Sequence, residues 1–439
     1  MGRSRAFAVA ITGGFWRWAP RSICSLAVLA LVVLPQGSVS AKSYTLPPEV
    51  NRALQSLMSI TPGDCPDEAA LDPAVGTISG FLDQQDQALA DFVHSMPDAM
   101  LWHAAVVWRQ GDLARAEREM AAWLAGAPAE HESRGTAESD LKLIRQERDL
   151  APLKIGRPQA QLQLAAVWQE ESTSDHRRVA VIWRDSHCLD HQPPGPSELD
   201  LYTRDAAGAG ARLGDAITIE DGWYADFGSG TGGDVNGDGL TDIVLSLDNG
   251  GNCWTCSHLR VFGADPDGLR EYSIENSNEV SGLQDLDGDG RLEAMAVAAR
   301  WEFLPYAELG LADKGSLCHA CSPGVFIVMS WRDGQYKEAC RDYPGYYQSH
   351  LAEVAENLKQ EKDFDYYLGG ALETFATLVQ MGRSDEALKS ANRLLTSGPF
   401  AKRYKGEGKT VIATLKKSLR QSAPHLDRAC PFAGFSLVK

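Results

Sequence analysis

Two nine-residue segments of this 439-residue chain carry oxygen-bearing side chains at the same four positions. Calcium prefers about six to eight oxygen ligands, and a short loop that turns at glycines can place them around one point. Each segment has glycine at its fourth and sixth positions. The expected side-chain ligands are Asp234, Asn236, Asp238 and Asp242 in the first segment and Asp285, Asp287, Asp289 and Glu293 in the second. The backbone carbonyls of Leu240 and Arg291 would fill the seventh position of each set.

Both segments are strongly acidic, with three carboxylates in the first and four in the second. Like charges at this spacing repel one another, so a bound cation is expected to form part of the fold. The alternative is a pair of acidic, glycine-rich turns without a metal, and the repetition of one spacing argues against it. Magnesium fits less well than calcium, because it keeps more of its water and rarely uses an all-protein set of ligands. Two calcium sites are therefore expected.

The residues after each segment distinguish between kinds of calcium loop. An EF-hand needs a carboxylate at position 12 and a helix on either side. Position 12 is Leu245 in the first segment and Ala296 in the second. Short apolar runs cover residues 243–247 and 294–298, which is typical of buried strands. The two loops are therefore expected to lead into strands.

The first segment and its surroundings resemble the FG-GAP/VCBS repeats, the integrin-type calcium loops of β-propeller blades. The resemblance rests on Phe227-Gly228 and on residues 233–245, Gly-Asp-Val-Asn-Gly-Asp-Gly-Leu-Thr-Asp-Ile-Val-Leu. It implies calcium held in a loop between strands of a blade, in a secreted or surface protein that binds a partner. Residues 246–248 replace the Gly-Ala-Pro of the family, and this chain has far fewer repeats than the family's closed propellers.

Residues 1–41 combine a basic beginning, an apolar run over residues 23–34 and the small residues Val39, Ser40 and Ala41. This pattern predicts a secretory signal peptide, and the apolar run is too short to span a membrane. We expect the mature chain to begin at Lys42 and to be exported to the periplasm or the extracellular space. No later stretch is long enough to cross a bilayer, so no membrane insertion is expected after cleavage.

The chain is acidic, with 59 acidic and 42 basic residues and a formal net charge of −17. Nucleic acids and anionic membrane surfaces require basic patches, so neither is an expected partner. The charge suits calcium, a basic partner or solubility.

Sequence periodicity divides the rest of the chain into three regions and predicts an α+β fold. Residues 42–158 are expected to be helical, and residues 98–128 resemble one tetratricopeptide unit or, alternatively, form an unrelated amphipathic hairpin. Residues 159–342 are expected to form three β-repeats, arranged as a partial or small β-propeller-like region or as an open stack of sheets. Residues 343–439 return to helix, and residues 375–399 again resemble one tetratricopeptide unit.

The third β-repeat contains an apolar and aromatic insertion over residues 301–311. An exposed loop of this composition is a candidate binding site for a partner. The alternative is a flap that packs over the neighbouring unit.

Two Cys-x-x-Cys pairs lie in the connections of the second and third β-repeats. Three arrangements fit them: a disulfide within each pair, a four-thiolate zinc site shared by both, and a redox-active pair. Export favours disulfides, and redox chemistry needs a helix start where these pairs are expected to join strands. A further bond between Cys65 and Cys430 would join the two helical regions. The two pairs are Cys253 with Cys256 and Cys318 with Cys321.

These features predict an exported calcium-binding β-repeat protein that acts as a protein-interaction or scaffold module. No nucleophile elbow, phosphate loop or catalytic metal motif is recognisable, so an enzyme is not expected. One alternative is a periplasmic inhibitor or immunity protein that acts on a secreted or cell-wall-degrading enzyme. A third is a hydrolase that uses the β-region.

Overall fold

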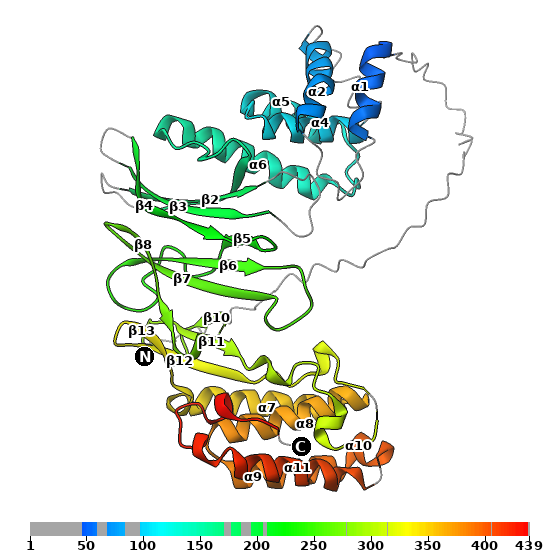
Figure 1. Ribbon diagram of the computed structural model, residues 1–439, viewed down its shortest axis with the longest axis vertical. Coiled ribbons are helices and arrows are strands. Elements are labelled where there is room, and N and C mark those ends of the chain that lie inside the picture. Colours follow the sequence, from blue (N-terminus) through cyan, green and yellow to red (C-terminus); the bar gives the residue numbers. More distant parts are fainter. Residues whose placement is uncertain are drawn as a thin grey trace, which may run out of the picture. The chain divides into compact units, whose positions relative to one another are not determined.

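The computed structural model describes most of the chain, with helices at both ends of the described sequence and strands in the middle (Figure 1). The predicted α+β class is confirmed. The predicted signal peptide of residues 1–41 lies outside the described residues. The described residues are 46–58, 68–83, 97–170, 177–185, 195–204, 209–277, 279–313, 315–404 and 406–437.

Helices form the described part of the N-terminal region. Helix α5 begins at Leu113 because the side chain of Asp112 accepts the backbone N–H of Arg115. Ala116, Met120 and Trp123 recur on one face of α5 and are buried in the helical core. The helices are α1 (Pro48–Met58), α2 (Glu68–Asp83), α4 (Pro97–Arg109), α5 (Leu113–Gly126) and α6 (Arg134–Leu150).

Within the described ranges, the first sheet has four antiparallel strands that pair in chain order. Its strand β2 is apolar on both faces, because alternate side chains belong to different cores. Val181 and Trp183 pack with the end of α6 and the turn after it, whereas Ala180 and Ile182 pack toward strands of the second sheet. The strands are β1 (Leu162–Gln169), β2 (Arg177–Asp185), β3 (Ser197–Arg204) and β4 (Gly210–Ile219).

The remaining described strands form one curled sheet, in the order β5-β6-β7-β10-β11-β12-β13-β9, with β8 paired to β7. The second and third predicted β-repeats therefore share a continuous sheet, joined where Val280 pairs with Leu259. The strands are β5 (Tyr224–Phe227), β6 (Thr241–Asp248), β7 (Ser257–Asp265), β8 (Gly268–Glu271), β9 (Ser273–Ile274), β10 (Val280–Gln284), β11 (Glu293–Val297), β12 (Phe326–Arg332) and β13 (Gln335–Glu338).

The C-terminal helices share one hydrophobic core with the second sheet. Helix α8 is the most deeply buried of them, and it packs against the short helix that contains Cys321. A side chain at Gly369 of α8 would place its Cβ 1.8 Å from the carbonyl oxygen of Cys321, so only glycine permits this approach. The helices are α7 (Pro344–Gln360), α8 (Phe364–Gln380), α9 (Ser384–Leu395), α10 (Gly398–Arg403) and α11 (Glu407–Gln421).

Most of the insertion at residues 301–311 packs into this core. Trp301 is buried and contacts the rings of Phe375 and Phe432, with centroid separations of 6.3 and 4.9 Å. The other large apolar side chains of the insertion are buried too, except Phe303, which is 45 % exposed. The insertion is therefore mainly a packing flap, and Phe303 is the part of it that a partner could contact. The other buried residues are Leu304, Tyr306, Leu309 and Leu311.

A long-range disulfide joins Cys340, after β13, to Cys430 near the end of the chain. A bond between Cys65 and Cys430, which the sequence left open, is therefore excluded, because Cys430 is already bonded to Cys340. Cys65 itself lies outside the described residues. From the sequence alone, several cysteines could have been the partner of Cys430. Cys340 is the partner because the fold brings both sulfur atoms to the backbone carbonyl of Val328 in β12.

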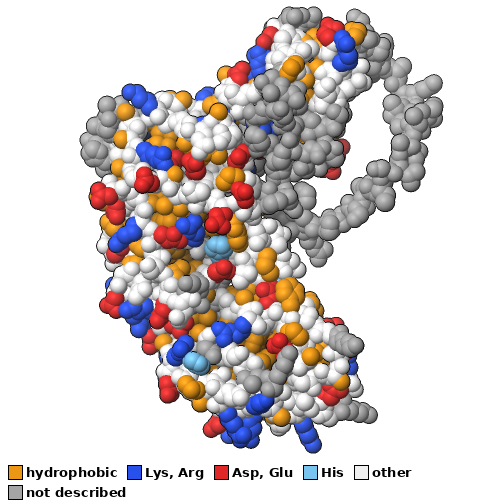
Figure 2. All heavy atoms as spheres, viewed as in Figure 1, with side chains coloured by type: hydrophobic (Ala, Val, Ile, Leu, Met, Phe, Trp, Pro, Cys, Tyr) orange, Lys and Arg blue, Asp and Glu red, His pale blue; other side chains and the backbone are white. Residues whose placement is uncertain are grey.

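None of the helices in the described ranges combines the length and the apolar character that a membrane span requires. Figure 2 shows acidic and basic side chains interspersed over the face in view, including the part formed by β-strands.

The side chain of Asp140 on α6 makes the stability of the fold depend on pH. Burial raises the pKa of Asp140 to about 6, and Arg184 opposes only part of the increase. Because the folded pKa exceeds the ordinary value of 3.8, the folded state loses stability as the pH rises from about 4 through 6. Asparagine does not titrate, so Asp140→Asn should not lose stability in this way. As the pH rises from 4 to 7, we expect the free energy of unfolding of this variant to increase by about 2 kcal/mol relative to that of the unchanged chain. Urea denaturation at both pH values measures this difference.

The matched control is Asp149→Asn, at the exposed end of the same helix. It is expected to shift stability equally at both pH values. A pH-independent effect of Asp140→Asn would contradict the assignment.

Candidate metal centre

The two acidic segments are loops that lead into strands, as their sequences predict. Residues 234–242 follow β5 and run into the first two residues of β6, and residues 285–293 run from the end of β10 to the first residue of β11. The glycines at the sixth position, Gly239 and Gly290, have φ angles of 86° and 90°. Glycine adopts this left-handed conformation without a steric penalty, so it lets the loop fold back on its own side chains.

The two loops share one pattern of internal hydrogen bonds. In each, the side-chain oxygens at positions 1, 3, 5 and 9 accept backbone N–H groups from positions 6, 5, 7 and 2. The eight bonds are 2.7–3.2 Å long. Position 7, expected to supply a carbonyl, is Leu240 or Arg291, and its N–H donates to the carboxylate at position 5. The repeated spacing in sequence is thus a repeated structure, and all eight oxygen-bearing side chains are held within their own loops.

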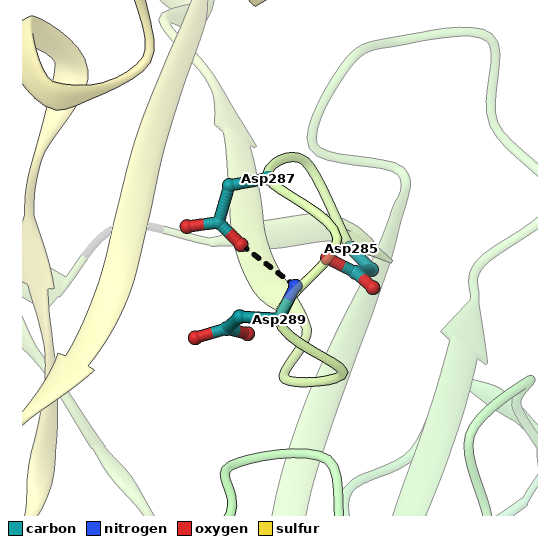
Figure 3. A group of neighbouring side chains, drawn as sticks. All are labelled: Asp285, Asp287 and Asp289. Carbon is teal, nitrogen blue, oxygen red and sulfur yellow. Dashed lines mark hydrogen bonds between the residues drawn. The ribbon is translucent and has the colours of Figure 1, made fainter.

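The second loop brings three carboxylates together at the surface (Figure 3). Ligand oxygens of Asp285, Asp287 and Asp289 lie within 4.8 Å of one another, and all three residues are exposed. Among the described residues, no other group of three His, Cys, Asp or Glu side chains meets this condition. Arg291 lies 4.0 Å from Asp289, which is too long for a strong ion pair. The donor set is all oxygen, which is the chemistry that calcium prefers.

The first loop is more deeply buried, with Asn236 and Asp242 almost fully inaccessible. The hydroxyl of Tyr272 donates to Asp242 at 2.6 Å and lies 3.2 Å from Asp238. Burial raises the pKa of Asp242 to about 6, and the neighbouring Asp238 and Asp234 carboxylates raise it further. A buried carboxylate among other carboxylates is costly unless a cation or donors compensate it.

A tyrosine accompanies the ninth position of both loops. Glu293 is buried like Asp242, and its pKa is raised by burial. Tyr343 lies beside it, and the Glu293 carboxylate adds to the effect of burial in raising the pKa of this tyrosine. Sequence reasoning missed both tyrosines, because each follows its loop only after two or more further strands.

The two loops are neighbours in the sheet. The N–H of Leu292 donates to the carbonyl of Val235 at 2.6 Å. The side chain of Arg291 lies against the backbone of Gly237, where even a methyl group would collide with it. An ion bound in one loop would therefore act on the geometry of the other.

Each Cys-x-x-Cys pair forms a disulfide within its own loop, which is the first of the three arrangements considered from sequence. The four-thiolate zinc site would need both bonds reduced, because a disulfide sulfur is not a thiolate ligand. The two disulfide-bonded Cys-x-x-Cys loops are close together, because the rings of Trp254 and His319, one from each loop, lie 4.9 Å apart. Glu302 accepts the N–H of Trp254 at 2.7 Å and lies 2.6 Å from Nδ1 of His319. The bonded pairs are Cys253–Cys256 and Cys318–Cys321.

Comparison of this chain with family models, with curated proteins and with solved structures found no match.

Proposed function

We propose that this chain is an exported calcium-binding protein whose two calcium loops stabilise a β-repeat module for protein interaction. The observation that carries the proposal is the repetition of one hydrogen-bonded loop, with the same ligand positions, at two adjacent places in one sheet. A chance acidic turn has no reason to recur with the same internal bonds.

Calcium is the ion that suits these ligands best. The side chains offer carboxylate and amide oxygens, and no nitrogen or sulfur donor takes part in either group. Calcium accepts flexible sets of about six to eight oxygens, whereas magnesium demands octahedral geometry and retains water. When bound, calcium would supply positive charge that offsets the repulsion among the carboxylates.

The protein's own residues hold the loops ready for an ion. Backbone N–H groups orient each carboxylate, and the bond from Leu292 to Val235 keeps the two loops in register. The loops join strands that belong to the curled sheet, so an ordered loop fixes the strands on either side of it. A structural role of the metal, coupled to folding, follows from this position.

Native mass spectrometry of the chain purified from the exported fraction, without chelator, tests the proposal. We expect two calcium ions per chain, disulfide-bonded Cys-x-x-Cys pairs, and a mass that places the N-terminus at Lys42. Incubation with a chelator should remove the two ions and leave the covalent mass unchanged. An exported chain that binds no metal would overturn the calcium assignment. One zinc ion with reduced cysteines would replace it with a thiolate site.

A further inference from the structure

A cavity of about 780 Å³ lies between α7, α8 and the loop that carries the Cys318–Cys321 disulfide. Its volume is in the range of ligand-binding pockets, which is about 300–1,000 Å³. It does not include either acidic loop, so the calcium proposal leaves it unused.

The lining of this cavity is negative. Glu353, Glu361 and Glu373 contribute carboxylates, and no lysine or arginine lines the cavity. Glu373 lies 2.8 Å from Nε2 of His350, and no ion pair within the described residues involves Glu353 or Glu361. Glu353 and Glu373 add to the effect of burial in raising the pKa of Tyr346, which also lines the cavity. The field inside therefore favours a positively charged ligand.

The spacing of these groups does not suit a metal ion. The carboxylates of the cavity and His350 do not form a group of three with ligand atoms within 4.8 Å, as the residues around Asp287 do. A cation with several hydrogen-bond donors spread over a larger volume, such as guanidinium or ammonium, can reach separated carboxylates.

One exposed aromatic side chain lines the cavity, and a second belongs to a residue whose backbone is hydrogen-bonded to the cavity lining. Among the described residues, Phe303 and Tyr366 are the two large hydrophobic side chains that are exposed, at 45 % and 46 %. Tyr366 lines the cavity directly. The N–H of Phe303 donates to the hydroxyl of Ser322 at 3.0 Å, and Ser322 also lines the cavity. Exposed aromatics beside a pocket are typical of sites that anchor a partner chain and contact cations through their rings.

The backbone of Phe303 has a strained conformation. Its φ angle is 51°, a left-handed conformation that a bulky residue rarely adopts. Such strain persists only where the surrounding structure maintains it, and it is often found at ligand sites.

We propose that this cavity binds a lysine or arginine side chain of a partner polypeptide, with Phe303 and Tyr366 contacting the residues beside it. The inference rests on the proposed function as an interaction module and names the class of partner: a chain with an exposed basic segment. Charge complementarity decides the occupant, because the cavity is lined by acidic groups and the rim offers aromatic faces.

The test is fluorescence anisotropy with a labelled glycine- and serine-rich peptide that carries two arginines. Its control is the same peptide with citrulline, which has the shape of arginine without the charge. We expect the arginine peptide to bind at least about tenfold more tightly than the citrulline peptide. Equal binding of the two peptides, or no binding of the arginine peptide, would overturn the proposal.

Variants locate the binding to the cavity. Glu353→Gln combined with Glu373→Gln is expected to weaken binding of the arginine peptide about tenfold, and Glu353→Gln alone serves if the double variant folds poorly. Glu356→Gln removes a charge from the same helix outside the cavity and should leave the affinity unchanged. Equal affinities of all these variants would place the peptide elsewhere.

The variant Phe303→Gly tests whether the aromatic ring contributes to peptide binding without changing the stability of the fold. Glycine relieves the left-handed strain, so this variant should be as thermally stable as the parent chain yet bind the peptide several-fold more weakly. Unchanged affinity would remove Phe303 from the site. Competition with agmatine, a free guanidinium compound, distinguishes a polypeptide from a small cation. We expect agmatine to displace the peptide only at a much higher concentration than that of the peptide. Displacement at an equal concentration would identify a small cation as the ligand and overturn the polypeptide assignment.

The same samples distinguish this inference from the calcium proposal. Thermal stability in calcium and in chelator reports on the loops, whereas anisotropy reports on the cavity. A calcium-dependent melting temperature without peptide binding would reject only the cavity assignment. Peptide binding without a calcium effect would reject only the metal assignment.

Discussion

Asp289→Ala is expected to lower the melting temperature by about 5 °C in calcium and to leave it unchanged in chelator. Removing a ligand at the fifth position disrupts the group that Asp289 forms with Asp285 and Asp287. An ion present at about a thousandfold excess over its dissociation constant stabilises the folded state by about 4 kcal/mol, and that contribution is lost. In chelator the substitution removes a repulsive carboxylate together with the exposed hydrogen bond that it accepts from the N–H of Arg291, and these two effects offset each other. Calorimetry of both proteins under both conditions measures the effect.

Asp238→Ala changes the equivalent position of the first loop and is expected to behave in the same way. Asp427→Ala is the control, because this exposed acid lies outside both loops. It should have the same small effect with and without calcium. An equal loss of stability in calcium and in chelator, for either loop variant, would show that the acids act as turn residues and not as ligands.

The paired substitution Cys340→Ala and Cys430→Ala is expected to destabilise the fold by about 4–5 kcal/mol, the entropy that this long closed loop removes from the unfolded chain. The two cysteines are 90 residues apart, and the segment between them contains α7 to α11. Both are fully buried, and Gln380 donates to Cys340 at 2.9 Å. Alanine avoids burying a new hydroxyl group without a partner. Urea denaturation under non-reducing conditions measures the loss.

The paired substitution Cys253→Ala and Cys256→Ala is the matched comparison. These cysteines are three residues apart, so the same entropy argument gives a loss of only about 2 kcal/mol. If the two pairs cost the same, loop length is not the source of the stabilisation. A larger loss for the short pair would point instead to a role of the Cys-x-x-Cys loop in holding its neighbour through Trp254 and Glu302.

The two acidic loops show how much of a candidate site can be predicted from local sequence. Ligand positions, glycine turns and the strand that follows all fall within about a dozen residues, so their spacing alone predicts the loop. The α+β class follows equally from periodicity, because the apolar period changes from helical to strand-like over long segments. The disulfide within each Cys-x-x-Cys pair is local in the same sense.

The partners of these loops could not be predicted in this way. Tyr272 and Tyr343 reach the ninth-position carboxylates only because later strands and turns pass beside the loops. The bond between Leu292 and Val235, which makes the loops neighbours, depends on the order of strands in the sheet. The connectivity of the distant cysteines could not be derived for the same reason, since a bond from Cys430 to Cys65 fits the sequence as well as the bond that Cys430 forms with Cys340.

The sequence by itself determined the acidic loops, the strands that they enter and the division into helical and β regions, because these depend on interactions between residues near one another in the chain. The tertiary structure alone decided that Cys340 meets Cys430. It also decided that the insertion buries Trp301 but exposes Phe303, and that α7 and α8 contribute acidic side chains to one cavity. These features require segments separated by tens of residues to pack together. The free energy of that packing comes from many contacts across the whole core, so no short sequence motif predicts it.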